Sequence, residues 1–503
     1  MNSQAAASSG VHFENPALTQ RLDSAVAIAL SLGAQHAEAR VMQTRTRHVS
    51  TADRHLESAG LSRTSGVGIR VLVDGCWGFA GSSSLAPDAL DAAARDAVLL
   101  ARTSRPLSTQ PVRLAAEPAH VGHWASACAI DPFAIADTDI VALLSEREAA
   151  VSDAPGVDHT DASFMAVDEQ TLLVTSEGTR VSQHKTRVHA DLTALGSNDR
   201  TGAIDTMRTL APPTARGWEY LIGDGWDWDA ELAGLPDHLA EKLAAPSVTP
   251  GPSTVVLDPS NLWLTIHESV GHATELDRAL GYEANYAGTS FATPDQLGTL
   301  RYGSALMHVT GDRVTPYGLA TTGWDDEGVA AQEWDLVRAG VLVGYQLDRG
   351  MAGEFGRPRS NGCAYADSPL HTPIQRMPNV SLQPSADEIT TDDLISRVDD
   401  GYYIVGDKSW SIDMQRFNFQ FTGQRFYRIK SGVIVGQVRD LAYQSRTPDF
   451  WGSLVGLGGR STYVLGGALN CGKAQPGQVA AVSHGCPSAV FENVNVLNAT
   501  EAS

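Results

Sequence analysis

The first half of the chain alternates between segments with helical and strand-like spacing of apolar residues. Apolar side chains recur at the spacing of an amphipathic helix in residues 16–34, 86–103 and 132–150. Strand-like alternation or short apolar runs fall between them, in residues 36–47, 66–79 and 163–194. Asp74-Gly75 separates the two runs within 66–79 and is typical of a hairpin turn. We therefore expect helices flanking an antiparallel sheet, an α+β arrangement.

The chain changes character near residue 245. Residues 243–260 contain four prolines, which indicate a boundary between two large units. Beyond this boundary the pattern predicts a helix at 261–280 and then short β runs at 341–347, 402–406, 417–429 and 433–439. We expect an N-terminal α/β domain over residues 1–245 and a β-rich C-terminal domain over residues 246–503 that carries the helix.

Composition argues against two classes of partner. The 503 residues carry a formal net charge of −21, so neither nucleic acid nor an anionic membrane surface is expected to bind. The five cysteines form no CxxC pair and have an odd total, which argues for a reducing compartment. Residues 1–10 lack the apolar core of a signal peptide, and no apolar run reaches the ~18–20 residues of a membrane span. We expect a cytoplasmic protein.

The strongest chemical signal is the pattern H-E-x-x-x-H at residues 267–272. His267 and His272 offer imidazole nitrogens, which suit Zn²⁺, and Glu268 offers a carboxylate beside them. A glutamate next to a metal-activated water can accept the proton of that water. The competing interpretation is an exposed helix that carries these side chains by chance.

The spacing of the two histidines constrains the backbone. In zinc peptidases with H-E-x-x-H, ligands at i and i+4 share one face of a helix. At i and i+5, ~100° per residue separates His267 and His272 by about 140° on an ideal α-helix. Both can reach one metal only if the helix widens by a residue, as in a π-bulge, and Gly271 tolerates such a distortion.

Other polar residues give weaker signals. Glu275 and Asp277 are alternative ligands or partners of the ligands, and Asp277 with Arg278 is expected to form a surface pair. The acidic run 325–327 either orients a ligand histidine or forms a solvated turn. Three residues are weak candidates for oxyanion donors and are better explained as structural: Arg359, Arg376 and Asn379.

A third metal ligand is missing from the motif, because a catalytic zinc ion usually has three protein ligands. A thiolate is the strongest candidate type. Cys471 lies in a glycine-flanked segment, where Lys473 would help to stabilise a thiolate. Cys486 is the rival, and His484 accompanies it. Either thiol is also explained as a buried structural cysteine, so the residues alone leave the choice open.

The motif and its surroundings resemble the metal-bearing, TldD-type member of the TldD/PmbA family of metallopeptidases. The resemblance begins with HESVGHATELDRA at 267–279, NYAGTSFA at 285–292 and NCGK at 470–473. Further matching segments lie in order along nearly the whole chain: GVGIRVLVDGCWGFA at 66–80, WDDEGVAAQ at 324–332, GVLVGYQLDR at 340–349, RSNGCAYADS at 359–368 and RMPNV at 376–380.

This resemblance implies a ligand set and an assembly. By position, the metal ligands would be His267, His272 and Cys471, with Glu268 as the general base, which favours Cys471 over Cys486. The family has two kinds of subunit, one with the motif and one without, which form a heterodimer around an enclosed cavity that admits a peptide. The implied partner is a TldE/PmbA-like paralogue or a second copy of this chain.

One segment departs from the family. Residues 406–429 carry one Trp and three Arg where other members carry glycines, which bears on substrate preference more than on chemistry.

We expect zinc-dependent hydrolysis of short or unfolded peptides, with Glu268 accepting a proton from a metal-activated water. One alternative is a non-catalytic structural subunit of a TldD/TldE-like assembly. The other is a hydrolase of amide or leader junctions in modified peptides. Zinc content separates the first alternative from a peptidase, and cleavage of a mixed peptide library separates the second.

Overall fold

The computed structural model describes residues 13, 15–108, 110–198, 200 and 202–500. Residues 1–10, on which part of the expectation about location was based, lie outside the described residues. In the part of the chain that is described, no helix combines the length and the apolar character needed to cross a bilayer. The fold is α+β as predicted, with mainly antiparallel sheets.

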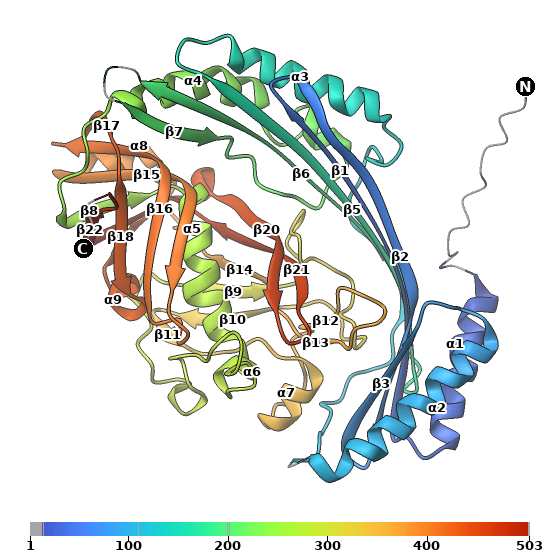
Figure 1. Ribbon diagram of the computed structural model, residues 1–503. Helices are drawn as coiled ribbons and strands as arrows, with labels where there is room; N and C mark the ends of the chain where they lie inside the picture. Colours follow the sequence, from blue (N-terminus) through green and yellow to red (C-terminus); the bar gives the residue numbers. More distant parts are fainter. Residues whose placement is uncertain (1–12, 14, 109, 199, 201, 501–503) are drawn as a thin grey trace, which may run out of the picture.

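Seven strands form one long, curved sheet on one side of the molecule (Figure 1). Their order is β3-β2-β1-β5-β6-β4, and β7 pairs with the other end of β6. β2 and β6 have 19 residues each, about 60 Å of extended chain at ~3.3 Å per residue. The strands are β1 (His36–Ala52), β2 (His55–Val73), β3 (Cys76–Ser82), β4 (Val121–Ala125), β5 (His159–Thr175), β6 (Arg180–Asn198) and β7 (Ala203–Arg208).

Four helices cover the outer face of this sheet at its two ends (Figure 1). They are α1 (Pro16–Ser31), α2 (Pro87–Ser104), α3 (Asp137–Ser152) and α4 (Trp228–Ala244). α1 and α2 share a hydrophobic core with β1 and β2, whereas α3 and α4 pack at the far end, over β5 and β6. The helices and strands predicted in this half are confirmed, although α3 begins five residues later than the pattern suggested, and β2 and β3 meet at the predicted Asp74-Gly75 turn.

The alternation of side chains in β1 creates two buried faces of different character. Ala37, Ala39 and Val41 pack beneath the helices. Glu38 and Arg40 alternate with them and are also buried, at 2% and 3% exposed. A sheet with water on one face would leave these charges solvated, so the second face must be covered by another part of the chain.

The acidic run 325–327 helps to cover that second face. Asp326 lies 2.9 Å from Arg40, and Glu327 lies 2.7 Å from Arg70. All three carboxylates of the run are buried. Both expectations for this run are therefore wrong, because it neither orients a histidine of the motif nor forms a solvated turn. It joins the inner face of the sheet to the C-terminal region.

Five strands of the C-terminal region close into a barrel, because β15 pairs with both β8 and β16 (Figure 1). They are β8 (Gly251–Leu257), β15 (Asp400–Ile412), β16 (Asn418–Lys430), β18 (Leu441–Arg446) and β22 (Ala489–Asn498). β17 (Val433–Val438) and β19 (Leu454–Leu457) extend it. The predicted runs 402–406, 417–429 and 433–439 lie in these strands.

Smaller elements complete the C-terminal region, and among them β12, β13, β20 and β21 lie between the barrel and the long sheet (Figure 1). The strands are β9 (Val309–Asp312), β10 (Glu333–Arg338), β11 (Val341–Leu342), β12 (Ala364–Tyr365), β13 (Ile374–Gln375), β14 (Asn379–Leu382), β20 (Val464–Lys473) and β21 (Gln478–Cys486). The helices are α5 (Pro259–Ile266), α6 (Leu276–Ala279), α7 (Arg349–Glu354), α8 (Thr391–Ser396) and α9 (Thr447–Gly452). The run 341–347 is a strand only in β11, because Val343 and Gly344 both donate to the carbonyl of Leu336 and end the ladder. The division between residues 245 and 246 stays a prediction.

Arg70 is the central cation between the two parts of the chain. It lies 2.7 Å from Glu38 on the neighbouring strand and 2.7 Å from Glu327 of the C-terminal region. Burial opposes ionisation of Glu38, but the charge of Arg70 and the hydrogen bonds from His36 and Arg70 together outweigh it and lower the pKa of Glu38 to about 2. Glu38 is therefore charged, and Arg70 is its main cationic partner.

Arg70→Ala is expected to lower the free energy of unfolding by about 3–5 kcal/mol, because Glu38 and Glu327 would remain buried without it. Arg338→Ala is the matched control, since its side chain is 66% exposed in the pair with Asp335, and it should change stability by less than about 0.5 kcal/mol. Urea denaturation followed by tryptophan fluorescence measures both. Equal effects of the two substitutions on the free energy of unfolding would contradict the role of Arg70 as the central buried cation.

Candidate metal centre

The helix predicted at 261–280 is present but divided. α5 begins at Pro259, and Asp258 caps it by accepting from the N–H of Ser260. After Ile266 the backbone widens into a π-helical turn, η3 (His267–Gly271), in which the N–H of His272 donates to the carbonyl of His267. A 3₁₀ turn, η4 (His272–Thr274), and the short α6 follow. The backbone widening expected from the histidine spacing is therefore confirmed.

Gly271 is needed in this turn because there is no room for a side chain, not because its backbone torsion angles are unusual. Its φ of −52° and ψ of −63° are helical values that any residue adopts. A Cβ at this position would lie 2.6 Å from the sulfur of Met377, too close for real atoms. Gln346 donates to the Gly271 carbonyl and thereby satisfies an acceptor that the widened turn leaves free.

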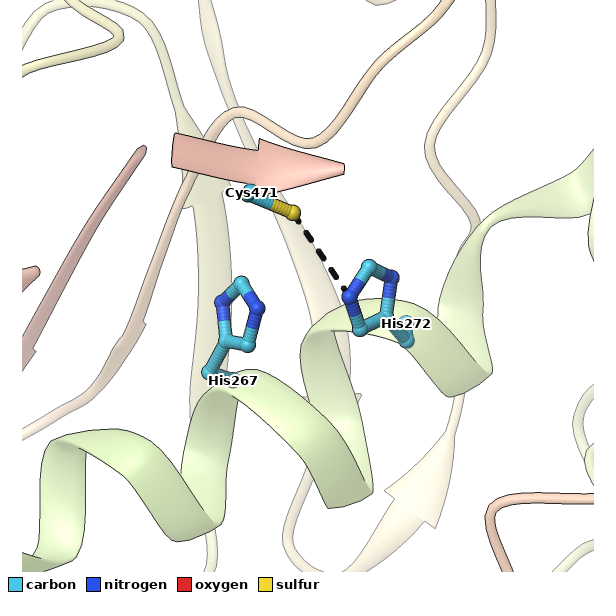
Figure 2. A group of neighbouring side chains, drawn as sticks. All are labelled: His267, His272 and Cys471. Carbon is cyan, nitrogen blue, oxygen red and sulfur yellow. Dashed lines mark hydrogen bonds between the residues drawn. The ribbon is translucent and has the colours of Figure 1, made fainter. Parts of the chain in front are cut away.

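The π-turn places both imidazoles on one side, where they meet a thiol from a distant strand (Figure 2). Candidate ligand atoms of His267, His272 and Cys471 all lie within 4.8 Å of one another, and the three residues are buried. Cys471 is part of β20, and its Sγ lies 3.6 Å from Nε2 of His272. Cys486 is not part of this cluster, because its thiol is buried against the carbonyl of Pro259.

Hydrogen bonds on the far side of each imidazole leave Nε2 facing the cluster. Nδ1 of His272 lies 2.9 Å from Oε2 of Glu275, which can only accept, so His272 donates there. Nδ1 of His267 lies 2.7 Å from Nε2 of His484. His484 in turn donates from Nδ1 to the carbonyl of Val380, so its Nε2 is the acceptor. This network assigns a lone pair to Nε2 of both His267 and His272, as metal ligation requires.

Burial keeps these histidines neutral. It lowers the pKa of His272 to about 3, although Glu275 opposes the shift, and it lowers the pKa of His484 to about 4. The pKa of His267 is also far below its ordinary value, through burial and then through the neighbouring imidazoles. Burial raises the pKa of Cys471 to about 11. The imidazoles are thus ready to bind a cation, while the thiol would ionise only beside one.

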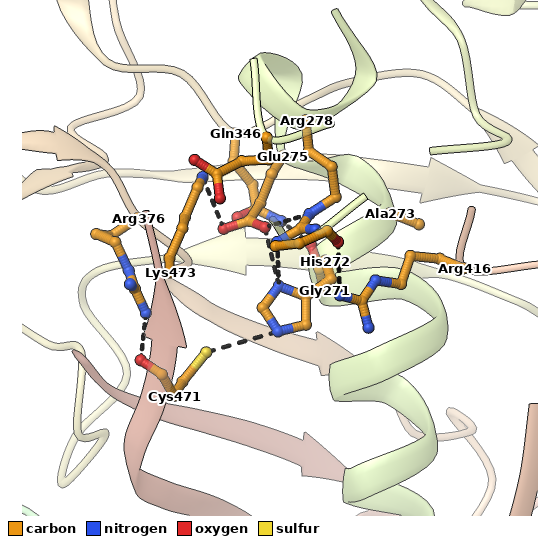
Figure 3. Close-up of polar contacts among 12 residues, drawn as sticks. Gly271, His272, Ala273, Glu275, Arg278, Gln346, Arg376, Arg416, Cys471 and Lys473 are labelled. Carbon is orange, nitrogen blue, oxygen red and sulfur yellow. Dashed lines mark hydrogen bonds and ion pairs between the residues drawn. The ribbon is translucent and has the colours of Figure 1, made fainter. Parts of the chain in front are cut away.

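A buried charge network stands behind His272 (Figure 3). Glu275 accepts from His272, from Nε of Arg278 at 3.0 Å and from Nζ of Lys473 at 3.2 Å. Asp277 also accepts from Lys473, at 2.8 Å. The expected surface pair of Asp277 and Arg278 is therefore wrong, because both are buried. Lys473 contacts these carboxylates, and its charge also acts to lower the pKa of the Cys471 thiol, the direction that the sequence suggested, although burial outweighs it.

The three candidate oxyanion donors have structural partners. Arg376 donates to the carbonyl of Cys471 and so holds β20 in place. Arg359 pairs with Glu117, and Asn379 bonds Asp312 and Thr321.

Glu268 borders the same cluster. It is 6% exposed, and its Oε2 accepts from Nη1 of Arg416 at 2.7 Å. Burial raises the pKa of Glu268 even though the guanidinium opposes the shift. A cavity of about 650 Å³ opens at this point, and its wall includes His267, Glu268, His272, Cys471, Trp410 and Arg416.

Sequence reasoning missed two of the residues around the cluster. His484 was noted only as a companion of Cys486, and its bond to His267 spans 217 positions. Arg416 lies in the segment 406–429, whose one Trp and three Arg were the only signal for it.

The donor set fits zinc. Two imidazole nitrogens and one sulfur match the nitrogen and sulfur ligands that Zn²⁺ takes, and three protein ligands leave a position open, as in catalytic zinc sites. The carboxylate of Glu275 on Nδ1 of His272 is the kind of partner that orients ligand histidines, and the imidazole of His484 accepts in the same position on His267.

Known proteins resemble this chain along most of its length. Models of domain 1, the central domain and the C-terminal domain of PmbA/TldA metallopeptidases match residues 37–101, 130–245 and 250–498. A metalloprotease of Methanothermobacter thermautotrophicus is 27% identical over 463 residues, which are 92% of this chain and 95% of that protein. A zinc metalloprotease TldD homolog of Saccharolobus solfataricus is 25% identical over 227 residues, 45% of this chain and 48% of that protein.

The fold is also that of a solved structure. The crystal structure of TldE from Thermococcus kodakarensis superimposes with a TM-score of 0.73 at 15% identity, covering 95% of this chain and 99% of that one. Together with the three domain models, which run in order from residue 37 to residue 498, these comparisons show that the chain belongs to the PmbA/TldD family of metallopeptidases.

Proposed function

We propose that this chain is a zinc-dependent peptidase that hydrolyses short or unfolded peptides in the cavity beside Glu268. The observation that carries this proposal is the meeting of His267, His272 and Cys471, with both Nδ1 atoms already bonded. The names of the relatives as metalloproteases support the same class.

The proposed chemistry assigns a distinct task to each side chain. A zinc ion held by His267, His272 and Cys471 would supply Lewis acidity, which lowers the pKa of a water and polarises a carbonyl. Glu268 would take the proton of the attacking water and return it to the leaving amine. Because Oε2 of Glu268 holds Arg416, Oε1 is the oxygen for this transfer. Glu275 and His484 would keep the two imidazoles oriented.

We further propose that the chain works with a second subunit, either a TldE/PmbA-like paralogue or another copy of itself. The similarity of the whole fold to TldE supports this assembly. Co-purification followed by mass identification of the bound subunit tests it. The five free cysteines support a reducing, cytoplasmic location.

His484→Leu is expected to weaken zinc binding by roughly 10- to 100-fold, because His267 would lose the acceptor for its Nδ1–H. His484→Gln should recover most of the affinity, since an amide can accept from His267 and donate to Val380. Competition with a chromophoric zinc chelator measures the affinities. His159→Ala, at a side chain that is 65% exposed, is the control. Equal affinities of the Leu and Gln variants would show that the bond to His267 is unimportant.

Glu268→Gln is expected to keep stoichiometric zinc and to lose peptide hydrolysis by about 10²- to 10⁴-fold, the share that a general base supplies. Cleavage of a mixed peptide library, read by mass spectrometry, measures activity, and elemental analysis measures zinc. Undiminished hydrolysis would remove Glu268 from the role of base. Wild-type protein without stoichiometric zinc would overturn the proposed function and favour the structural-subunit alternative.

A further inference from the structure

Arg416 adopts a backbone conformation that its side chain does not favour. It lies in the turn between β15 and β16, with a φ of +61°. In this left-handed region the Cβ of an L-residue crowds the backbone, so glycine is the residue that fits without strain. Strain that persists in a tight turn points to a task for the side chain itself.

The guanidinium of Arg416 lies at the metal centre (Figure 3). Nη1 donates to Oε2 of Glu268 at 2.7 Å, and Nη2 donates to the carbonyl of Ala287 at 3.2 Å. The side chain is 13% exposed. Its Nε is buried and has no hydrogen-bond partner among the described residues. Arg416 therefore holds the proposed base while one of its own donors stays unsatisfied.

The other cations of the cavity wall already have partners of their own. Arg208 pairs with Asp407, and Lys408 pairs with Asp205. Among the described residues, Arg416 forms its ion pair with Glu268, and the proposed chemistry requires that carboxylate for proton transfer. A bound zinc ion would add further positive charge. The cavity thus favours an anionic ligand. Arg416 is the cation of its wall that can bind one, because its present partner, Glu268, is required for proton transfer.

We propose that Arg416 binds a carboxylate of the peptide substrate. This inference rests on the proposed peptidase function and narrows its substrate class to peptides that place a carboxylate beside the scissile bond. A planar guanidinium matches a carboxylate through paired hydrogen bonds, and Nη1, which now donates to Glu268, would supply one of them. When the substrate carboxylate takes Nη1 of Arg416, Oε2 of Glu268 is released from the ion pair, while Oε1 accepts the proton of the attacking water.

A peptide can supply this carboxylate from two sources, its C-terminus or an acidic side chain. The test therefore uses two pairs of peptides: one peptide as the free acid and as the C-terminal amide, and one amidated peptide with an internal Glu or Gln. The measured quantity is kcat/KM for each peptide. Wild-type protein should prefer the carboxylate by roughly 10- to 100-fold in at least one pair, the range of a charge-assisted hydrogen bond.

Arg416→Gly should abolish that preference, to within about 2-fold, because the anchor is gone while the turn becomes unstrained. Arg54→Gly is the matched control, since Arg54 also has a positive φ, +68°, but lies in the turn between β1 and β2 with a side chain that is 48% exposed. It should retain the wild-type preference. Arg416→Gln removes the charge and keeps the side-chain length, so it decides the question if the glycine variant does not fold.

Binding to zinc-free protein gives a second readout that needs no hydrolysis. Calorimetric titration with the same peptide pairs should show the carboxylate preference in wild-type protein and its loss in Arg416→Gln. Equal kinetics and equal binding of both members of each pair by wild-type protein would overturn the inference, as would a preference that survives in the Arg416 variants. Hydrolysis without preference rejects this inference alone, whereas absence of both zinc and hydrolysis rejects the proposed function.

Discussion

The candidate centre depends on one backbone hydrogen bond, from the N–H of His272 to the carbonyl of His267. This bond adds a residue to the helical turn, and the added residue brings two imidazoles that an ideal α-helix would separate onto the same side. The surroundings fix the widened turn, because Met377 occupies the space beside Gly271 and Gln346 bonds its carbonyl. Tertiary packing, not local propensity, holds this geometry.

Local sequence was enough to predict several of the elements and the widened turn, because periodicity and spacing are properties of neighbouring residues. The helix α1 and the hairpin at Asp74-Gly75 followed from pattern alone. The choice of Cys471 over Cys486 did not, since both lie in glycine-flanked segments of similar composition. Resemblance to a family made that choice, and the structure then placed the Cys471 thiol 3.6 Å from His272.

The partners of the histidines and of Glu268 could not be predicted, because they come from distant parts of the chain. His484 meets His267 across 217 positions, and Arg416 meets Glu268 across 148. The wrong predictions for the charged residues have a second cause. Asp326 and Arg278 look like surface residues by composition, yet both are buried in ion pairs that only the assembled fold supplies.

The long separation between the imidazoles and the thiol has a consequence for the order of events during synthesis. Cys471 follows His272 by 199 positions and enters through β20. A nascent polypeptide that has not yet reached Cys471 holds both imidazoles and lacks the sulfur. Such a fragment lacks one of the three candidate ligands. The ribosome-bound chain therefore has no complete candidate centre while its own unfolded segments are nearby.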